Sequence, residues 1–225
     1  MSAKDREQQQ RISGMNADVL VLTEARIGAI PHGYKRATSA FIPTDGSDAL
    51  FAVVAAAELE SVPVPELPTA AAALVTHNAQ TWLVVGICMP WRRDAPPLPP
   101  DAAPPGVSGP DAWRHVLDQL DACLHGLRKS HPQLPVLLAG DFNQTLVGRV
   151  VGSGVGREQL QRVLTRHGLV AFTATSPSAI PDCRSIDHLC ARASKAEPLT
   201  WLENRITRRR DELSDHAGYL VELIC

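Results

Sequence analysis

The sequence has no large excess of either charge and no long hydrophobic run. Its formal net charge is −2 over 225 residues. A net charge this close to zero gives no overall positive potential for binding nucleic acid. It does not exclude a nuclease that binds through a local site. No run of about 18 apolar residues occurs, so we expect no membrane span. The first fifteen residues are polar and lack the apolar core of a signal peptide.

The sequence also has no cysteine pattern typical of disulfide-rich or zinc-binding proteins, and it lacks several common enzyme motifs. The five cysteines are odd in number, widely spaced and include no C-x-x-C pair. A disulfide framework or a zinc site is therefore not expected, and reduced cytoplasmic thiols fit better. No H-E-x-x-H motif occurs, which argues against a metalloprotease, and the glycine-rich stretch 148–156 lacks the Gly-Lys-Ser/Thr ending of a P-loop.

What is present is an ordinary globular composition, 44% hydrophobic and 20% charged. The length suits one large domain, and we expect a single domain over residues 1–225. The stretch from Pro90 to Pro110 contains eight prolines, which exclude a regular helix or a central strand. We interpret it as a surface loop, at about 90–110, that joins a strand to a helix.

Strand-like runs alternate with a few amphipathic stretches along the chain. Apolar residues at helical spacing predict helices, and short apolar or alternating runs between turn residues predict strands. The expected helices are 5–14, 111–129 and 157–167, and the expected strands are 17–24, 38–42, 50–57, 70–76, 81–89, 136–140, 185–191, 199–203 and 217–224. This order favours a layered α/β domain, with a sandwich of two sheets as one arrangement.

The most informative stretch is an apolar run that ends in an acid and an amide. The run from Val136 to Gly140 predicts a fully buried strand, and Asp141 and Asn143 follow it. In an extended chain, residues two apart point the same way, so we expect both side chains to project together from the rim of a sheet. Ligand sites of layered α/β proteins tend to lie there, which predicts a metal or phosphate site.

Acids recur at comparable places. Glu24 ends another buried-strand pattern, Asp187 lies in Ser-Ile-Asp-His, and Asp215 and His216 lie in Ser-Asp-His directly before the last expected strand. An acid after an apolar run is most often a turn former or a helix cap, so each alone indicates little. Together and in this order they are harder to dismiss.

The set resembles the endonuclease/exonuclease/phosphatase superfamily, which includes repair nucleases, pancreatic-type deoxyribonucleases and inositol polyphosphate 5-phosphatases. The resemblance extends from Asp18 to Glu222, through the motifs DVLVLTE (18–24), GDFN (140–143), SIDH (185–188) and SDH (214–216). It implies an α/β (α+β) fold: a four-layer sandwich of two mostly antiparallel β-sheets flanked by helices. It also implies hydrolysis of phosphoester bonds.

The resemblance implies a role for each motif residue. Glu24 matches the family's metal-binding glutamate, and Asp215 matches an acid near the metal. The implied metal is Mg²⁺, with Mn²⁺ as an alternative; one or two carboxylates suffice for Mg²⁺, which keeps several waters. Asp141 matches the acid that orients or deprotonates the attacking water, and Asn143 matches the amide that holds the phosphate.

The resemblance also implies a catalytic histidine and an acid that orients it, from the SDH and SIDH motifs. His216 matches the histidine that contacts the scissile phosphate, and Asp187 matches the acid that hydrogen-bonds this histidine and fixes its tautomer, as in catalytic triads. Metal and histidinium together neutralise phosphoester charge before water attacks. The next residue, His188, should face the other way in a strand, and we expect it to be structural.

Two departures from the family pattern stand out. Family members normally begin with a strand that carries an asparagine near the metal, whereas this sequence begins at the helix that follows; we therefore expect the usual first strand to be lacking. Near residue 90, many relatives have a histidine, tyrosine or asparagine contact. Here Arg92 could bind a phosphate and Trp91 could stack on a base, or both could be surface residues.

These features predict a divalent-metal-dependent phosphoesterase that hydrolyses phosphodiester bonds in a nuclease-like way. The expected substrate is a phosphoester. A nucleic acid would need cations along its backbone, and only the four arginines in 205–210 and the pair Arg92–Arg93 offer them. The 205–210 run is equally well a solvated loop balanced by Asp211 and Glu212, so a small phosphorylated substrate stays open. The alternative is a non-catalytic or weakly active phosphate-binding module that retains the fold without the asparagine-bearing strand. We expect a monomer in either case.

Overall fold

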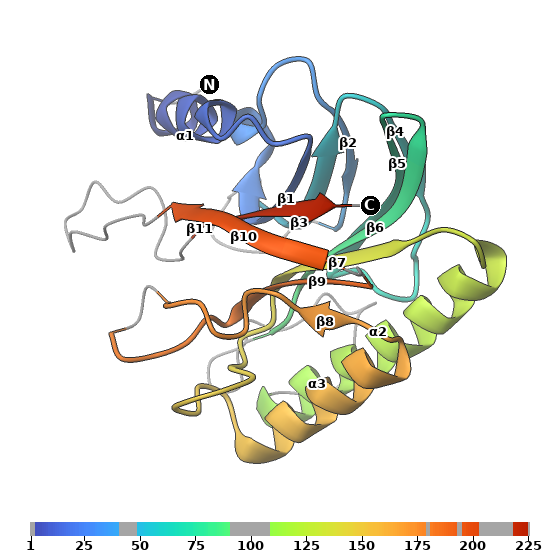
Figure 1. Ribbon diagram of the computed structural model, residues 1–225, viewed down its shortest axis with the longest axis vertical. Helices are drawn as coiled ribbons and strands as arrows, with labels where there is room; N and C mark the ends of the chain where they lie inside the picture. Colours follow the sequence, from blue (N-terminus) through green and yellow to red (C-terminus); the bar gives the residue numbers. More distant parts are fainter. Residues whose placement is uncertain are drawn as a thin grey trace.

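Two β-sheets pack face to face, and helices cover their outer surfaces (Figure 1). The computed structural model describes residues 3–40, 49–90, 109–178, 181–192, 195–202 and 218–224. From one side to the other, the layers are helix α1, a three-stranded sheet, a six-stranded sheet, and helices α2 and α3. The predicted α+β sandwich of two sheets flanked by helices is therefore confirmed.

The first sheet has the strand order β1-β3-β2 and is antiparallel throughout. Its elements, with the helix before them and a short turn of 3₁₀ helix η1, are α1 (Ala3–Gly14), β1 (Val19–Arg26), η1 (Ile27–Ala29), β2 (Lys35–Thr38) and β3 (Ala49–Ala56). Ile12 of α1 packs against Leu20 and Val53 on the outer face of this sheet. In residues 3–40 the first strand is β1, directly after α1, and it forms one edge of the sheet.

The second sheet has the strand order β4-β5-β6-β7-β9-β8, with β6 and β7 parallel and the other pairs antiparallel. Its elements and helices are β4 (Leu59–Val62), β5 (Ala70–His77), β6 (Gln80–Cys88), α2 (Gly109–Ser130), β7 (Val136–Asp141), α3 (Gly154–Arg166), β8 (Val170–Ala171) and β9 (Asp187–Ala191). A separate antiparallel pair is formed by β10 (Lys195–Leu202) and β11 (Gly218–Ile224).

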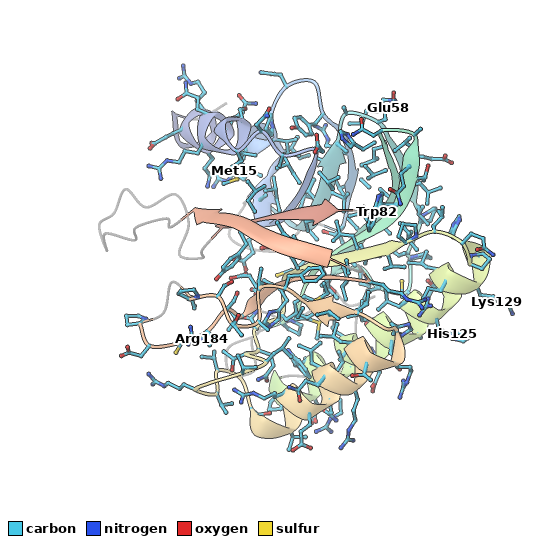
Figure 2. All side chains as sticks on the ribbon, viewed as in Figure 1. Met15, Glu58, Trp82, His125, Lys129 and Arg184 are labelled. Atoms are coloured by element: carbon cyan, nitrogen blue, oxygen red, sulfur yellow. The ribbon has the colours of Figure 1, made fainter. Side chains whose placement is uncertain are left out.

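The two faces of the second sheet bury different clusters, because side chains alternate along a strand. Leu83 of β6 packs with Trp113 and Leu160 of the helices. Val84, the next residue, packs with Val54 of the first sheet. The side chains in Figure 2 fill both interfaces, while His125 and Lys129 mark the outward side of α2.

Small residues bring the two sheets close together. A Cβ atom added at Gly86 would lie 3.0 Å from a methyl carbon of Val21 and 3.2 Å from one of Val54. Alanines dominate the rest of this interface, including Ala52, Ala71 and Ala73. The two sheets therefore pack closely where β6 faces β1 and β3.

The structure refines several predicted elements. The strand expected at 38–42 shares only Thr38 with β2, and residues 41 and 42 lie outside the described part of the chain. Strand β4 was not predicted. Helix α3 begins earlier than expected because the Ser153 hydroxyl caps it, accepting a hydrogen bond from the Gly156 N–H at 2.9 Å. Most of the proline-rich stretch lies outside the described residues. No helix in the described part of the chain is long and apolar enough to span a membrane.

Candidate functional site

Three neighbouring strands place Cys88, Asp141 and Asp187 in one row. Cys88, the last residue of β6, is paired with Asp141, the last residue of β7, and Asp141 is paired with Asp187, the first residue of β9. Residues paired across a sheet point to the same face, and here that face is turned toward the first sheet. The row therefore lies at the edge of the sandwich, on its inner side.

Glu24 approaches this row from the first sheet. It lies near the end of β1, is exposed, and has a φ of 51°, a conformation that is strained for a non-glycine residue and is often found at functional sites. Burial raises the pKa of the Cys88 thiol well above its usual value, and the carboxylates of Asp141, Glu24 and Asp187 raise it further. Three acids from three strands thus act electrostatically on one thiol.

Phe51 and Cys88 bury their side chains together between the two sheets. Phe51 lies on β3, and the two residues form a small buried cluster of their own, with Ala40 packed against it. Sequence reasoning missed both residues. Cys88 does end an apolar run, as Asp141 does, so its position on the strand was the available signal.

Asp141 and Asn143 form a closed hydrogen-bonded unit. The Asp141 carboxylate accepts from the Asn143 backbone N–H at 2.8 Å and from its side-chain Nδ2 at 2.9 Å. Asn143 has a φ of 50°, so the chain has left the extended conformation. The predicted reason for their meeting is therefore wrong: the two side chains meet because the chain turns back on itself. They also do not project from a rim, since each is only 1% exposed.

Contacts from three elements fix the segment between them. The indole Nε1 of Trp113, on α2, donates to the Phe142 carbonyl oxygen at 2.9 Å. The Phe142 N–H donates to the Ile186 carbonyl oxygen at 2.9 Å, and the Met89 N–H donates to the Asp141 carbonyl oxygen at 2.7 Å. The turn is therefore held by α2, by the approach to β9 and by the end of β6.

One atom of this unit remains unsatisfied. The Asn143 Nδ2 group donates to the Met89 carbonyl and to Asp141, which fixes the amide orientation. Its Oδ1 is buried without a hydrogen-bond partner among the described residues. Amide and carboxylate oxygens, such as Asn143 Oδ1 and the carboxylate of Glu24, are hard donors of the kind that Mg²⁺ prefers. No group of three His, Cys, Asp or Glu side chains in the described ranges is close enough to hold a metal alone.

His188 faces away from the row of acids, as predicted. It is 2% exposed, its Nε2 is 2.8 Å from the Gln144 carbonyl oxygen, and its ring centroid is 5.5 Å from that of Phe142. Burial lowers the pKa of His188 to about 4, although the bond to Gln144 and the charge of Asp187 oppose the shift. The neutral ring donates to the Gln144 carbonyl and serves packing on the helix side.

Comparison with solved structures identifies the arrangement. The endonuclease domain of TRAS1, a telomere-specific non-LTR retrotransposon, superimposes with a TM-score of 0.63 at 16% identity over 99% of this chain and 93% of that chain. The chain has the fold of the endonuclease/exonuclease/phosphatase superfamily. A family member from Leptotrichia buccalis gives 0.63 at 11% identity (100% and 95% covered), and the human Nocturnin catalytic domain gives 0.60 at 11% (99% and 88%). No family model and no curated protein sequence matches the chain.

The remaining site residues suggested by the superfamily resemblance fall outside the described part of the chain. These are Trp91, Arg92, Asp215 and His216, and the arginine run 205–210 lies outside it as well. The described chain resumes at Gly218, two positions after His216. Of the predicted residues, the structure therefore brings together Glu24, Asp141, Asn143 and Asp187.

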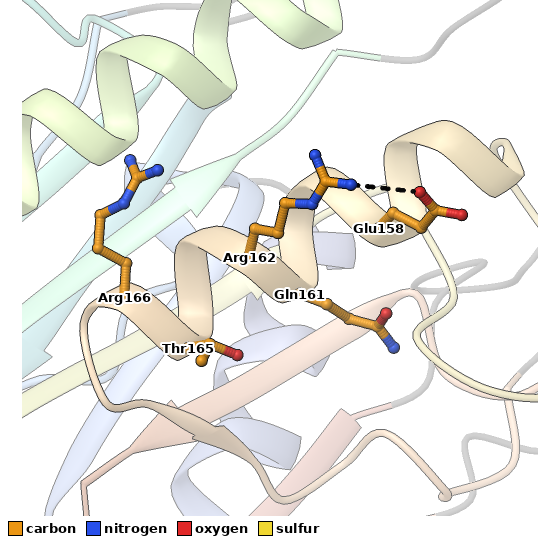
Figure 3. Close-up of a pocket in the computed structure, with 5 residues that line it drawn as sticks. All are labelled: Glu158, Gln161, Arg162, Thr165 and Arg166. Carbon is orange, nitrogen blue, oxygen red and sulfur yellow. Dashed lines mark ion pairs between the residues drawn. The ribbon is translucent and has the colours of Figure 1, made fainter.

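A separate hollow of about 490 Å³ lies on the surface of α3 (Figure 3). All five residues that line it belong to this one helix: Glu158, Gln161, Arg162, Thr165 and Arg166. Glu158 and Arg162 form an exposed ion pair at 3.6 Å. The lining includes none of the acids described above, and the hollow is the solvent-facing side of an amphipathic helix.

Proposed function

We propose that the protein is a divalent-metal-dependent hydrolase of phosphoester bonds that cleaves phosphodiesters in a nuclease-like way. The observation that carries this proposal is the strand register that places Cys88, Asp141 and Asp187 side by side at one end of the sandwich. The Glu24 carboxylate, from the first sheet, acts on the same thiol. The fold, which is also that of the TRAS1 endonuclease domain, supports the same class of reaction.

In this proposal Glu24 and Asp215 would hold the metal, and the unpartnered Oδ1 of Asn143, which can only accept hydrogen bonds, would accept one from a water of the hydrated ion. The bound Mg²⁺ or Mn²⁺ supplies positive charge that offsets the negative charge developing on the phosphoryl oxygens. The exposure of Glu24 leaves its carboxylate accessible to a hydrated ion.

The chain's own groups perform the proton transfers. Asp141 takes a proton from the attacking water as the new oxygen–phosphorus bond forms and the bond to the leaving oxygen breaks. Both of its carboxylate oxygens accept one hydrogen bond from Asn143, which holds the carboxylate in place. His216 contacts the scissile phosphate, and Asp187 fixes the tautomer of His216.

In this proposal, arginines and one tryptophan select the substrate. Arg92 would bind a substrate phosphate, Trp91 would stack on a base, and the arginines between 205 and 210 would follow a nucleic-acid backbone. Because the formal net charge is −2, these local cations would have to provide all the attraction for a polyanion.

One observation favours the second candidate, a phosphate-binding module without turnover. Asp141 and Asn143 are each 1% exposed, and a water that attacks a phosphate must reach Asp141. The same unit could instead serve to hold the strand ends together, with phosphate bound nearby but not hydrolysed.

Hydrolysis of bis(p-nitrophenyl) phosphate, measured with Mg²⁺, with Mn²⁺ and with a chelator, separates the two candidates. We expect metal-dependent turnover that falls at least about 100-fold in Asp141→Asn, the usual size of an acid–base contribution. Asp118→Asn is the matched control, since Asp118 is an exposed aspartate on α2. Phosphate binding without turnover in the wild type would overturn the hydrolase proposal. Active protein is then assayed on single-stranded DNA, abasic duplex DNA, RNA and small phosphoesters.

A further inference from the structure

The strand pair β10–β11 has no backbone ladder to either sheet in the described part of the chain. Its position relative to the acids therefore depends on side chains. In Figure 1 β10 and β11 run across the middle of the molecule, between the first sheet and β8. At the start of β11, the residue that follows Gly218 is Tyr219, and it makes such a side-chain link.

Tyr219 reaches the segment that leads into β9. It is half-buried, and its hydroxyl donates to the Pro177 carbonyl oxygen at 2.7 Å. It also shares a hydrogen bond with the hydroxyl of Ser185, which is fully buried. One phenol thus joins the last strand to two points on the loop that precedes Asp187.

Ser185 in turn fixes the backbone of Asp187. The Asp187 N–H donates to Ser185 Oγ at 3.0 Å. The single hydrogen of that hydroxyl serves two acceptors in turn, the Asp187 carbonyl oxygen and the phenol oxygen of Tyr219, whose own hydrogen goes to Pro177. Thr173 Oγ1 also donates to this carbonyl at 3.0 Å. The chain of contacts from Tyr219 through Ser185 therefore ends on the residue whose carboxylate belongs to the row of acids.

The phenol is close enough to Asp187 to respond to its charge. Burial raises the pKa of Tyr219 to about 12; the Asp187 carboxylate contributes to this rise, and the bond to Ser185 opposes it. Tyr219 consequently stays protonated at any ordinary assay pH, and it acts as a hydrogen-bond donor rather than as a base.

We propose that Tyr219 is a positioning residue that sets Asp187, through Ser185, for its role in phosphoester hydrolysis. The inference rests on the proposed function, because the role of Asp187 does. Tyr219 itself touches no reacting atom. Its effect is to hold β11, the strand that follows the SDH motif, at a fixed position relative to Asp187. In the proposed mechanism, Asp187 is the acid that orients His216 of that motif.

The chain offers a matched control. It contains two tyrosines, and Tyr34 also donates its hydroxyl to a backbone carbonyl, that of Ala17, at 2.6 Å. Tyr34 packs on the α1 side of the first sheet. Tyr219→Phe and Tyr34→Phe thus each remove one phenol–carbonyl hydrogen bond and should lower Tm by similar amounts, and only the first removes a link to Asp187.

With bis(p-nitrophenyl) phosphate as the probe, Tyr219→Phe should lower kcat about tenfold at unchanged KM, the effect of losing one positioning hydrogen bond. Tyr34→Phe should leave both constants unchanged. Added to Asp187→Asn, Tyr219→Phe should cost less than about twofold, because residues that act as a unit are not additive. A full tenfold loss in that background, or a kcat loss no larger than that of Tyr34→Phe, would overturn the inference.

A titration tests the contact without relying on turnover. In the Tyr34→Phe background the ultraviolet absorbance of tyrosinate reports Tyr219 alone. Asp187→Asn should lower the pH at which this absorbance rises, since it removes a charge that raises the pKa of Tyr219. An unchanged onset would refute the link to Asp187. An inactive wild type with the expected shift would instead refute the proposed function and leave the contact standing.

Discussion

Replacing Gly140 by alanine tests whether the close approach of β6 and β7 sets the position of Asp141. Gly140 has a φ of 143°, where side chains other than hydrogen are strained. An added Cβ would lie 1.9 Å from the carbonyl oxygen of Ile87 on the neighbouring strand. Real Cβ contacts start at 3.0 Å, so the two backbones would have to separate by 1.1 Å, the difference between these distances.

The cost of Gly140→Ala follows from these numbers. Backbone strain at this φ costs about 1–3 kcal/mol, and separating the strands weakens the hydrogen bond between Met89 and Asp141, whose net worth is about 0.5–1.5 kcal/mol. With some loss of packing, we expect the free energy of unfolding to fall by about 3–5 kcal/mol. For a chain of this length that corresponds to a Tm lower by roughly 6–20 °C.

Urea unfolding followed by tryptophan fluorescence measures the change, since Trp113 is fully buried. Gly126→Ala is the matched control: this glycine lies within α2 (Gly109–Ser130), and an added Cβ meets nothing within 4 Å. It should stabilise the protein by about 0.5–1 kcal/mol. If Gly140→Ala unfolds within 1 kcal/mol of the wild type, the tight register of β6 and β7 is wrong.

Three further outcomes follow from the structure. Asp141→Asn should lower metal-dependent turnover at least about 100-fold and keep a cooperative urea transition, because the amide oxygen can still accept one of the two bonds from Asn143; loss of the transition would show that folding requires the carboxylate. Because burial lowers the pKa of His188 from 6.5 to about 4, the unfolded chain takes up the proton first as pH falls. The free energy of unfolding should therefore drop by up to about 3 kcal/mol between pH 6.5 and pH 4, and a profile that keeps this dependence in His188→Gln would contradict the assignment. Asp121→Ala removes the carboxylate on α2 that pairs with the buried ring of His167 at 2.8 Å, so Tm should fall by roughly 2–10 °C, with an unchanged Tm as the contrary result.

Local patterns were sufficient for most of the elements. Helices α1, α2 and α3 and strands β1, β3, β5, β6 and β7 coincide with predicted segments to within a few residues. The apolar periodicity of these segments is a property of neighbouring residues, so it can be recognised without knowing which distant segment each one packs against. The start of β2 at Lys35 was missed, because β2 is defined by its pairing with β3 and an edge strand of four residues carries little pattern of its own.

The sequence by itself indicated that the acids Glu24, Asp141 and Asp187 lie at or near the ends of strands. Only the tertiary structure decided how these acids meet. Register between β6, β7 and β9 places Cys88, Asp141 and Asp187 in one row, and register is fixed by contacts between segments far apart in the chain. The turn at Asn143, with its φ of 50°, likewise depends on two long-range hydrogen bonds. Asn143 donates to the Met89 carbonyl, and Trp113 donates to the Phe142 carbonyl. A single sequence shows which carboxylate and amide side chains are present. Their arrangement in space is set by packing between segments that are far apart in the chain.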